Sequence, residues 1–345
     1  MDVSKPTVTD IGRVAGVSLA TVDRVLNGRP GVRQSTIDKV YAAIEKIGYV
    51  RDVGAANLAR SRRYRFAFVL PVSASAFLGS VRESIADTRG TSLADRTDTQ
   101  IIEVEAEDPH ALVRHLRQLD GSKVDGVAIL ANETPLLRDE ITALKARGVR
   151  VVAIISDLPS AGRDHFVGID NIAAGRTAGV LMGRFLTGRP GVVITLANTM
   201  SSREAIERRR GFDEVIVERF PSLSVAPTIE IHDNPETVRV LLPRILERRH
   251  DIVGLYSLGT GHRGMIDVLR RLKLAPPPVA IAHDLTSHLA SALRDGIVDA
   301  VISQNVDHIV RSAIRVLRAK CDGVPIVASQ ERIRIEVVLA ENLPD

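Results

Sequence analysis

The sequence predicts an α/β protein in which a small all-α domain precedes two larger lobes, each a parallel sheet wrapped by helices. Two observations predict this. Three short segments within residues 8–47 carry apolar residues at helical spacing, and beyond Arg65 ten strand-like apolar runs alternate with helical stretches. Ten strands in one sheet would be unusual, which favours two lobes. We expect a headpiece over residues 1–50, a linker over 51–64 and a two-lobed domain over 65–345.

The first two segments predict a helix-turn-helix. Thr9 can cap the first helix, Gly16 allows a tight turn, and Ser18 can cap the second helix. The apolar faces of these helices are Ile11, Val14 and Ala15, then Val22, Val25 and Leu26. The residues left pointing outward near the start of the second helix are Leu19, Ala20, Asp23 and Arg24. In helix-turn-helix proteins such positions meet base edges in the major groove. The alternative is a small helical bundle or a dimerisation arm.

A third helix completes the small domain. Ser35 can cap it, and we expect it over Thr36–Ile47. Its apolar residues form one stripe: Ile37, Val40, Tyr41, Ile44 and Ile47. Three short helices that close on one another are enough for such a domain to fold.

Positive charge is concentrated at the start of the chain. Residues 1–65 hold 12 Lys/Arg against 6 Asp/Glu, a net charge of +6, and the remaining residues carry a net −2. A surface that binds phosphates requires such an excess. The charge therefore favours the DNA interpretation of the helix-turn-helix.

The linker contains an Ala-rich segment, Gly54–Arg60, of about two turns. A helix this short does not hold in water by itself, so the segment is either a helix that forms on a partner or a flexible tether. The arginines around it, which could lie along phosphates or be solvated, are Arg60, Arg62, Arg63 and Arg65.

The ten strand-like runs predict parallel sheets, because helical stretches separate most of them. The runs are Phe66–Pro71, Gln100–Val104, Gly126–Ala131, Val149–Ile155, Phe166–Ile169, Val192–Leu196, Thr228–His232, Ile252–Ser257, Val279–His283 and Ala300–Ser303. A helix over Ala173–Leu186 follows the fifth run, and its segment Gly175–Gly179 is expected to pack close to the sheet.

Polar side chains follow several of these runs. Asp157, Asp170, Asp284 and Gln304 stand at strand ends, and Arg208 lies on a helix. Carboxylates, amides and a guanidinium are the groups that hold vicinal hydroxyls, because each oxygen accepts two hydrogen bonds and Arg supplies a fork of donors. An Asp at a strand end is also a common helix cap, and both interpretations remain open at each position.

Residues 7–61 closely resemble the DNA-binding headpiece of the LacI family of bacterial repressors. The matching words are Val-Thr-Asp-Ile-Gly-Arg-Val-Ala-Gly-Val-Ser at 8–18, Thr-Val-Asp-Arg-Val-Leu-Asn at 21–27 and Ile-Gly-Tyr at 47–49. The resemblance implies a homodimer or tetramer on a pseudo-palindromic operator, with a hinge helix whose Leu58 wedges between base steps. The residues expected at the DNA are Thr7, Ser18, Leu19, Ala20, Thr21, Asp23, Arg24, Asn27, Arg33, Thr36, Tyr49, Asn57 and Leu58.

The rest of the chain resembles the periplasmic-binding-protein-like sensor of the same family. In that fold each lobe is a doubly wound sheet, and a ligand, here a sugar or polyol, lies in the cleft at the carboxyl ends of the strands. The resemblance carries ligand contact onto Phe77, Asp157, Asp170, Arg208, Asp284 and Gln304.

Three departures from the family pattern stand out. Asp23 replaces the usual Ser of the recognition helix and is expected to pair with Arg24 or to accept from a cytosine amino group. Arg51-Asp52 replaces Pro-Asn before the hinge. The Gly-rich turn Ser257–Gly261 stands where many members carry an Asn-Asp that contacts the sugar, so a polyol, a sugar acid or a modified sugar remains possible as ligand.

Other chemistry is not indicated. The one cysteine, Cys321, suits a reducing cytoplasm, and the nine histidines lack the spacing of zinc sites. His262 and His283 could contact the ligand or be structural. Neither a P-loop nor a nucleophile elbow is present, and neither a signal peptide nor an apolar run near 18 residues is found. We therefore expect a cytoplasmic non-enzyme without cofactor, metal or membrane contact. The alternatives are a solute-binding protein and a sugar-processing enzyme of the same fold.

Overall fold

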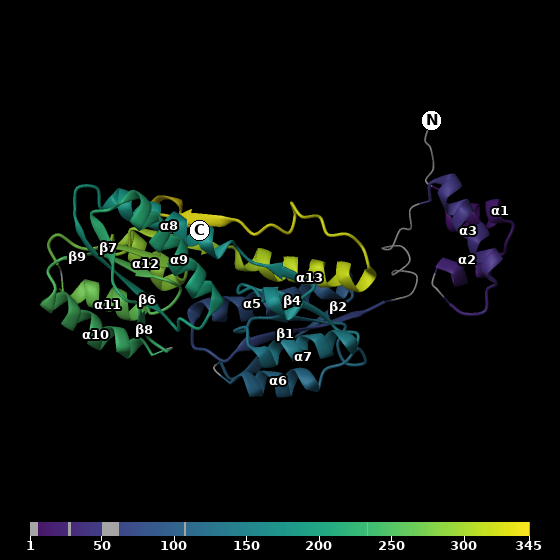
Figure 1. Cartoon of the computed structure of the whole chain (residues 1–345), viewed down its shortest axis with the longest axis horizontal. Coiled ribbons are helices and arrows are strands. Elements are labelled where there is room, and N and C mark those ends of the chain that lie inside the picture. Colours follow the sequence, from purple (N-terminus) through teal and green to yellow (C-terminus); the bar gives the residue numbers. More distant parts are fainter. Residues whose placement is uncertain are drawn as a thin grey trace. The chain divides into compact units, whose positions relative to one another are not determined.

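The computed structural model describes residues 6–26, 29–49, 62–106, 108–232, 234–272 and 274–344, with the backbone alone described at 89–95 and 235. The chain forms two compact units, Met1–Arg62 and Arg63–Asp345 (Figure 1). Among the helices of the described ranges, none is long and apolar enough to cross a membrane.

The N-terminal unit is the expected three-helix domain. Its helices are α1 (Val8–Ala15), α2 (Leu19–Leu26) and α3 (Gln34–Ile47). Its buried core consists of Ile11, Val22, Val25, Val40 and Ala43. The turn between α1 and α2 is tight: Gly16 adopts a left-handed conformation (φ 66°), and the Val17 amide donates to the Gly12 carbonyl at 3.0 Å. Ser18 Oγ accepts from the Thr21 amide at 3.2 Å, as expected of a cap.

Two expected caps and two expected apolar-face residues were wrong, and one of those two is Val14, which is 39% exposed. Helix α1 begins two residues earlier than a cap at Thr9 would allow, because Asp10 accepts from the amide and hydroxyl of Thr7 at 2.9 and 2.7 Å and closes a capping box there. Helix α3 begins at Gln34, so Ser35 lies in its first turn. Tyr41 is 55% exposed, because the small core is already closed by its neighbours on α3.

The first lobe of the C-terminal unit is a five-stranded parallel sheet in the order β2-β1-β3-β4-β5. Its strands are β1 (Tyr64–Pro71), β2 (Thr97–Val104), β3 (Gly126–Ile129), β4 (Arg150–Ile154) and β5 (His165–Val167). Helix α5 (Ala76–Asp95) packs with α13 (Val306–Asp322), and α6 (Pro109–Arg117) packs with α7 (Pro135–Ala146). These two pairs cover opposite faces, because alternate residues of the strands join separate buried clusters.

The second lobe is a seven-stranded sheet in the order β12-β11-β10-β9-β6-β7, with β8 beside β6. Its strands are β6 (Gly191–Ala197), β7 (Leu223–Val225), β8 (Ile229–Glu230), β9 (Ile252–Ser257), β10 (Val279–His283), β11 (Ala300–Gln304) and β12 (Ile335–Val338). All pairs are parallel except β11 with β12. Its helices are α8 (Asn171–Phe185), α9 (Arg203–Arg219), α10 (Pro235–Arg248), α11 (His262–Leu272) and α12 (Ser287–Arg294).

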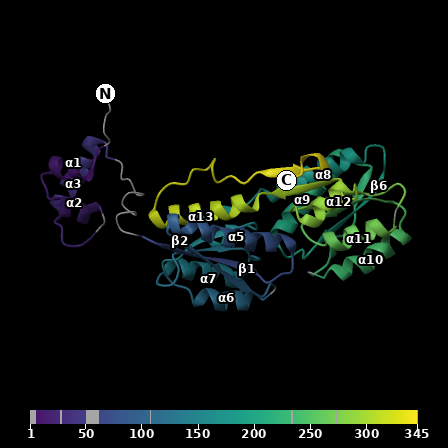
Figure 2. The same cartoon turned by 180° about the vertical axis from the view of Figure 1, so that it is seen from behind.

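The chain crosses between the lobes three times. It passes to the second lobe after β5, returns between β11 and α13, and goes back between α13 and β12. Figures 1 and 2 show α13 running beside α5 on the first lobe, although the two helices are more than 200 residues apart in the chain. The two doubly wound lobes confirm the predicted fold class. The short strands β7 and β12 were not predicted.

Glycines bring α8 and α9 into close contact. A Cβ atom on Gly175 would lie 2.0 Å from the carbonyl oxygen of Arg208, and one on Gly211 would lie 2.1 Å from that of Ile172. The two glycines of the expected segment Gly175–Gly179 therefore meet α9 and not the sheet, whereas Ala178 between them joins the buried cluster that contains strand residues. The crossing determines where the backbone of Arg208 lies.

We predict that Gly211→Ala destabilises the C-terminal unit, because the added methyl would force the two helices apart. Overpacking of this kind costs about 1–3 kcal/mol. The matched control is Gly79→Ala on α5, where an added Cβ meets no atom within 4 Å, and which should stabilise the protein by about 0.5–1 kcal/mol through helix propensity. Urea unfolding of the two variants measures both free energies. Equal effects would contradict the close packing of α8 on α9.

Candidate functional site

The N-terminal unit presents one face of α2 to solvent. Val22 and Val25 are buried on the opposite face, whereas Leu19 is 55% exposed. The exposed members of the predicted DNA set are Thr7, Ser18, Leu19, Ala20, Asp23, Arg24 and Arg33, and the half-buried members are Thr21, Thr36 and Tyr49. The other three, Asn27, Asn57 and Leu58, lie outside the described residues.

Asp23 forms an ion pair with Arg29, at 3.4 Å between Oδ2 and Nη1. Arg24 was the expected protein partner, but adjacent residues on a helix point in different directions and do not face each other. The pair offsets the negative charge of Asp23 near a surface that is otherwise basic.

A cavity of about 540 Å³ lies between the two lobes of the C-terminal unit. Its lining residues follow β1, β2, β3 and β4 of the first lobe and β6, β9 and β10 of the second. These are the carboxyl ends of parallel strands, where ligands of open α/β sheets bind. The cleft thus has the position that the topology predicts for a ligand site.

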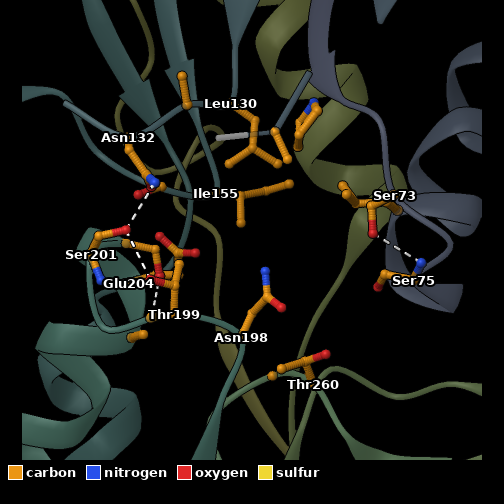
Figure 3. A pocket seen from close by; sticks show the side chains of 18 of the residues that line it. Ser73, Ser75, Leu130, Asn132, Ile155, Asn198, Thr199, Ser201, Glu204 and Thr260 are labelled. Carbon is orange, nitrogen blue, oxygen red and sulfur yellow. Dashed lines mark hydrogen bonds between the residues drawn. The ribbon is translucent and has the colours of Figure 1, made fainter. Parts of the chain in front are cut away.

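The two walls of the cavity differ in chemistry. The first lobe contributes most of the large apolar side chains, namely Pro71, Phe77, Leu78, Val104, Leu112, Leu130 and Ile155, and also the carboxylates of Glu105, Asp108 and Glu133. The second contributes a row of hydroxyl and amide groups: Asn198, Thr199, Ser201, Ser202 and Thr260. Figure 3 shows Asn132, Thr199, Ser201 and Glu204 gathered on one side, across from Ser73 and Ser75. Asn132 Nδ2 donates to Ser201 Oγ at 3.4 Å and joins the walls.

Arg208 is the most buried charged residue of the cavity, with 1% of its surface exposed. Its Nε donates to Asn171 Oδ1 at 2.8 Å, and its Nη1 donates to the Leu258 carbonyl at 2.7 Å and to Asp284 Oδ2 at 3.2 Å. Its Nη2 is buried and has no hydrogen-bond partner among the described residues. A buried donor without a partner is costly, so Nη2 offers a ready contact to an acceptor in the cavity.

Both carboxylate oxygens of Asp284 accept hydrogen bonds, one from Arg208 and one from Gln304. Its Oδ1 accepts from Gln304 Nε2 at 2.9 Å, and its backbone is left-handed (φ 63°), a conformation that Asp tolerates better than most residues. Gly259 allows the loop after β9 to approach, because a Cβ atom there would lie 3.0 Å from Arg208 Nη1.

A buried polar pair lies beneath this site. Tyr256 and His283 are joined by a hydrogen bond of 2.6 Å between Oη and Nε2, and Phe212 stacks on Tyr256 with 4.5 Å between ring centroids. Burial raises the pKa of Tyr256 and lowers the pKa of His283. Both side chains are therefore neutral near pH 7. Burial also lowers the pKa of His262, at the start of α11, to about 4.

The structure brings together part of the predicted ligand set. Phe77, Arg208 and Asp284 line the cavity, and Gln304 contacts Asp284 from behind it. Asp157 is instead paired with Arg163, at 2.6 Å between Oδ2 and Nη2.

Asp170 is exposed and caps α8, because its Oδ1 accepts from the Ala173 amide at 2.9 Å. The hydroxyl and amide row of the second lobe was missed. The sequence did contain a signal for it, since Asn198-Thr199 stands one residue beyond the predicted strand Val192–Leu196.

Two family models match the chain. Residues 66–324 match the model described as periplasmic binding protein domain, and residues 7–52 match the model of bacterial regulatory proteins, lacI family. Both matches agree with the division of the chain into a small helical unit and a two-lobed unit.

Similar proteins include catabolite control protein A of Priestia megaterium, 30% identical over 151 residues, which are 44% of this chain and 43% of that protein. The HTH-type transcriptional repressor PurR of Klebsiella pneumoniae is 23% identical over 255 residues, 73% of this chain and 72% of the repressor. The chain spans about half the length of the first curated relatives that it matches.

Among solved structures, a solute-binding protein of Burkholderia graminis in complex with D-arabinose has a TM-score of 0.72 at 20% identity, over 81% of this chain and 96% of that chain. A structure named as that of a putative LacI transcriptional regulator of Bacteroides fragilis has a TM-score of 0.70 at 18% identity, over 81% of this chain and 98% of that chain. At this identity the likeness shows the fold alone.

We predict that stability falls as the pH falls from about 6.5 towards 4, in part through His262. The unfolded chain takes up a proton at this residue below its ordinary pKa of 6.5, whereas the folded chain resists protonation down to about 4. The slope from one such group is at most about 1.4 kcal/mol per pH unit. Urea unfolding at several pH values should show a shallower slope for His262→Gln.

The matched control is His110→Gln, because His110 is exposed, and this variant should keep the wild-type slope. If the free energies of unfolding of His262→Gln and of the wild type fall with the same slope as the pH falls, then burial does not lower the pKa of His262 in the folded protein. The statement that its ring is buried and neutral would then be contradicted.

Proposed function

The chain belongs to the periplasmic binding protein domain family and to the lacI family of bacterial regulatory proteins, and on this premise we propose that it is a DNA-binding transcriptional regulator whose operator affinity is set by a small ligand. The observation that carries the proposal is the union, in one chain, of a basic helix-turn-helix with a two-lobed ligand-binding domain. We propose that it acts in the cytoplasm as a repressor and catalyses no reaction.

The DNA part of the proposal rests on α2. Its exposed face is free of core contacts, and Arg24 on that face has the donors to read a guanine. We propose that a homodimer places one α2 in each of two major grooves of a pseudo-palindromic operator. We further propose that the linker segment Gly54–Arg60, which lies outside the described residues, supplies a hinge helix with Leu58 at the minor groove.

The ligand part rests on the cavity. Hydroxyl and amide side chains, together with carboxylates, suit a ligand with several hydroxyl groups, and Arg208 Nη2 lacks an acceptor. We propose a sugar-like or polyol effector between the lobes. The Burkholderia graminis protein holds D-arabinose on the same fold, which supports this ligand class.

The switch follows from the three crossings between the lobes. A ligand that contacts both walls favours their closed arrangement, and closure would shift the first lobes of a dimer against each other. Operator affinity then changes only by the difference in ligand affinity between the two arrangements.

We predict that Arg24→Ala weakens binding to the operator by about 1–3 kcal/mol and relaxes preference at one base pair of each half-site, because a base-edge contact is lost. A gel shift with DNA from upstream of the chain's own gene cluster measures the effect. The control is Lys46→Ala, an exposed residue at the far end of α3, which should bind like the wild type. An equal loss of affinity for operator and random DNA would mean that Arg24 contacts only phosphate.

We predict that Asn198→Ala weakens ligand binding by about 1 kcal/mol, or about fivefold, because an amide contact is removed from the cavity wall. Calorimetric titration with a panel of pentoses, hexoses and polyols, together with their phosphate esters and acids, identifies a ligand of the wild type and then compares the variants. Ser224→Ala, exposed on β7 outside the cavity, is the control and should bind normally. Wild-type affinity in Asn198→Ala would remove this residue from the ligand site.

A further inference from the structure

A smaller pocket of about 140 Å³ adjoins the main cavity. The two share Ser75, Phe77, Gly259 and Thr260 among their lining residues, so the smaller pocket is a side chamber of the same cleft. Its remaining lining comes from both lobes and includes His262, which from the sequence could contact the ligand or be structural.

Three helices begin at this side chamber. Residues 74–77 lead into α5, residues 259–263 lead into α11, and Thr286 and His288 lie at the start of α12. The first turn of a helix has amide groups without an intrahelical acceptor and carries a partial positive charge. Three such ends around one small pocket favour a negatively charged group within it.

Helix α11 begins directly after a glycine. The residue before it is Gly261, which is left-handed (φ 79°) and has no side chain that could accept from the helix. The chain therefore runs from strand β9 through a Gly-rich loop to the first turn of α11. Backbone amides in such a loop are free to face an anion.

The charge of the lining changes sign along the cleft. The side chamber is lined by His262, Arg263 and His288, and its described lining residues include no Asp or Glu. The main cavity has Arg208 as its one Lys or Arg among the described lining residues, and Arg208 is already paired with Asp284. Its other carboxylates are Glu105, Asp108, Glu133 and Glu204. An anionic group is therefore repelled from the main cavity and attracted to the side chamber.

His262 provides a second, independent indication of a ligand. It is only 9% exposed, and its buried Nε2 has no hydrogen-bond partner among the described residues. Because burial lowers its pKa to about 4, the ring is neutral near pH 7 and can carry its proton on Nε2. An anion in the chamber would accept from this N–H and remove the cost of an unpaired buried donor.

We propose that the side chamber is an anion subsite, which binds the phosphate or carboxylate of a ligand whose hydroxyl groups occupy the main cavity. The proposal deepens the proposed function, on which it rests for the role of the ligand as effector. Hydroxyl groups donate to the carboxylates of the main cavity, while the anionic group accepts from the helix starts, Arg263 and His262. The effector is then an acidic or phosphorylated polyol and not a neutral sugar.

The test is a titration of the full chain with inorganic phosphate and, separately, with acetate, at constant ionic strength. Nitrogen-15 spectra of the histidine side chains, with the His262 signal assigned from His262→Gln, should show a saturable shift. Arg263→Gln should weaken binding of the anion about tenfold, or about 1.4 kcal/mol. The matched control is Arg271→Gln, an exposed residue at the other end of α11, which should bind like the wild type.

The anion that binds more tightly shows whether the subsite prefers a tetrahedral group, as in phosphate, or a planar one, as in acetate. The absence of a His262 shift with either anion would overturn the proposal, as would equal weakening by Arg263→Gln and Arg271→Gln, which would indicate general charge screening. A gel shift of the wild-type chain with its operator is run in parallel. If the chain does not bind DNA, the proposed regulatory function is contradicted, but the anion subsite is not. The failure of the proposed function can therefore be distinguished from the failure of the anion subsite.

Discussion

The buried pair of Arg208 and Asp284 is the interaction on which the C-terminal unit's cleft depends. Removing a guanidinium and a carboxylate from water is costly, and their attraction offsets that cost only when further hydrogen bonds satisfy both groups. Here those bonds come from Asn171 on α8, Gln304 on β11 and the Leu258 carbonyl after β9. The pair therefore joins the ends of several elements, and Nη2 of Arg208, a residue that lines the cavity, keeps no hydrogen-bond partner among the described residues.

The position of the pair depends on residues without side chains. Gly175 admits the backbone of Arg208 against α8, and Gly259 admits the loop after β9 against the guanidinium. Any larger residue at either position would have to displace an atom of this network. The geometry of the charged site is thus determined by close approach of backbones as much as by the charged groups themselves.

The sequence predicted what depends on local pattern. Periodicity located the three headpiece helices and a strand within each of ten runs, because each helix or strand buries one face or is buried on both. It could not tell a helix cap from a ligand contact: Asp170 and Asp284 both follow strands, yet only Asp284 lines the cavity. That difference is set by packing. The hydrogen bond between Tyr256 and His283, and the row of hydroxyl and amide groups that includes Asn198, likewise depend on how segments far apart in the chain meet.

The asymmetry of the cleft constrains any ligand that switches this chain. The wall of the first lobe, which holds most of the large apolar side chains, and the hydroxyl- and amide-bearing wall of the second are linked by three crossings, at residues 168–170, 305 and 323–334. A ligand that satisfied only the polar wall would bind open and closed lobes alike and would shift no equilibrium. A ligand that reaches the side chamber contacts helix starts of both lobes at once. The affinity of such a ligand therefore depends on closure of the lobes. Because of this dependence, ligand binding can change the DNA affinity of the headpiece.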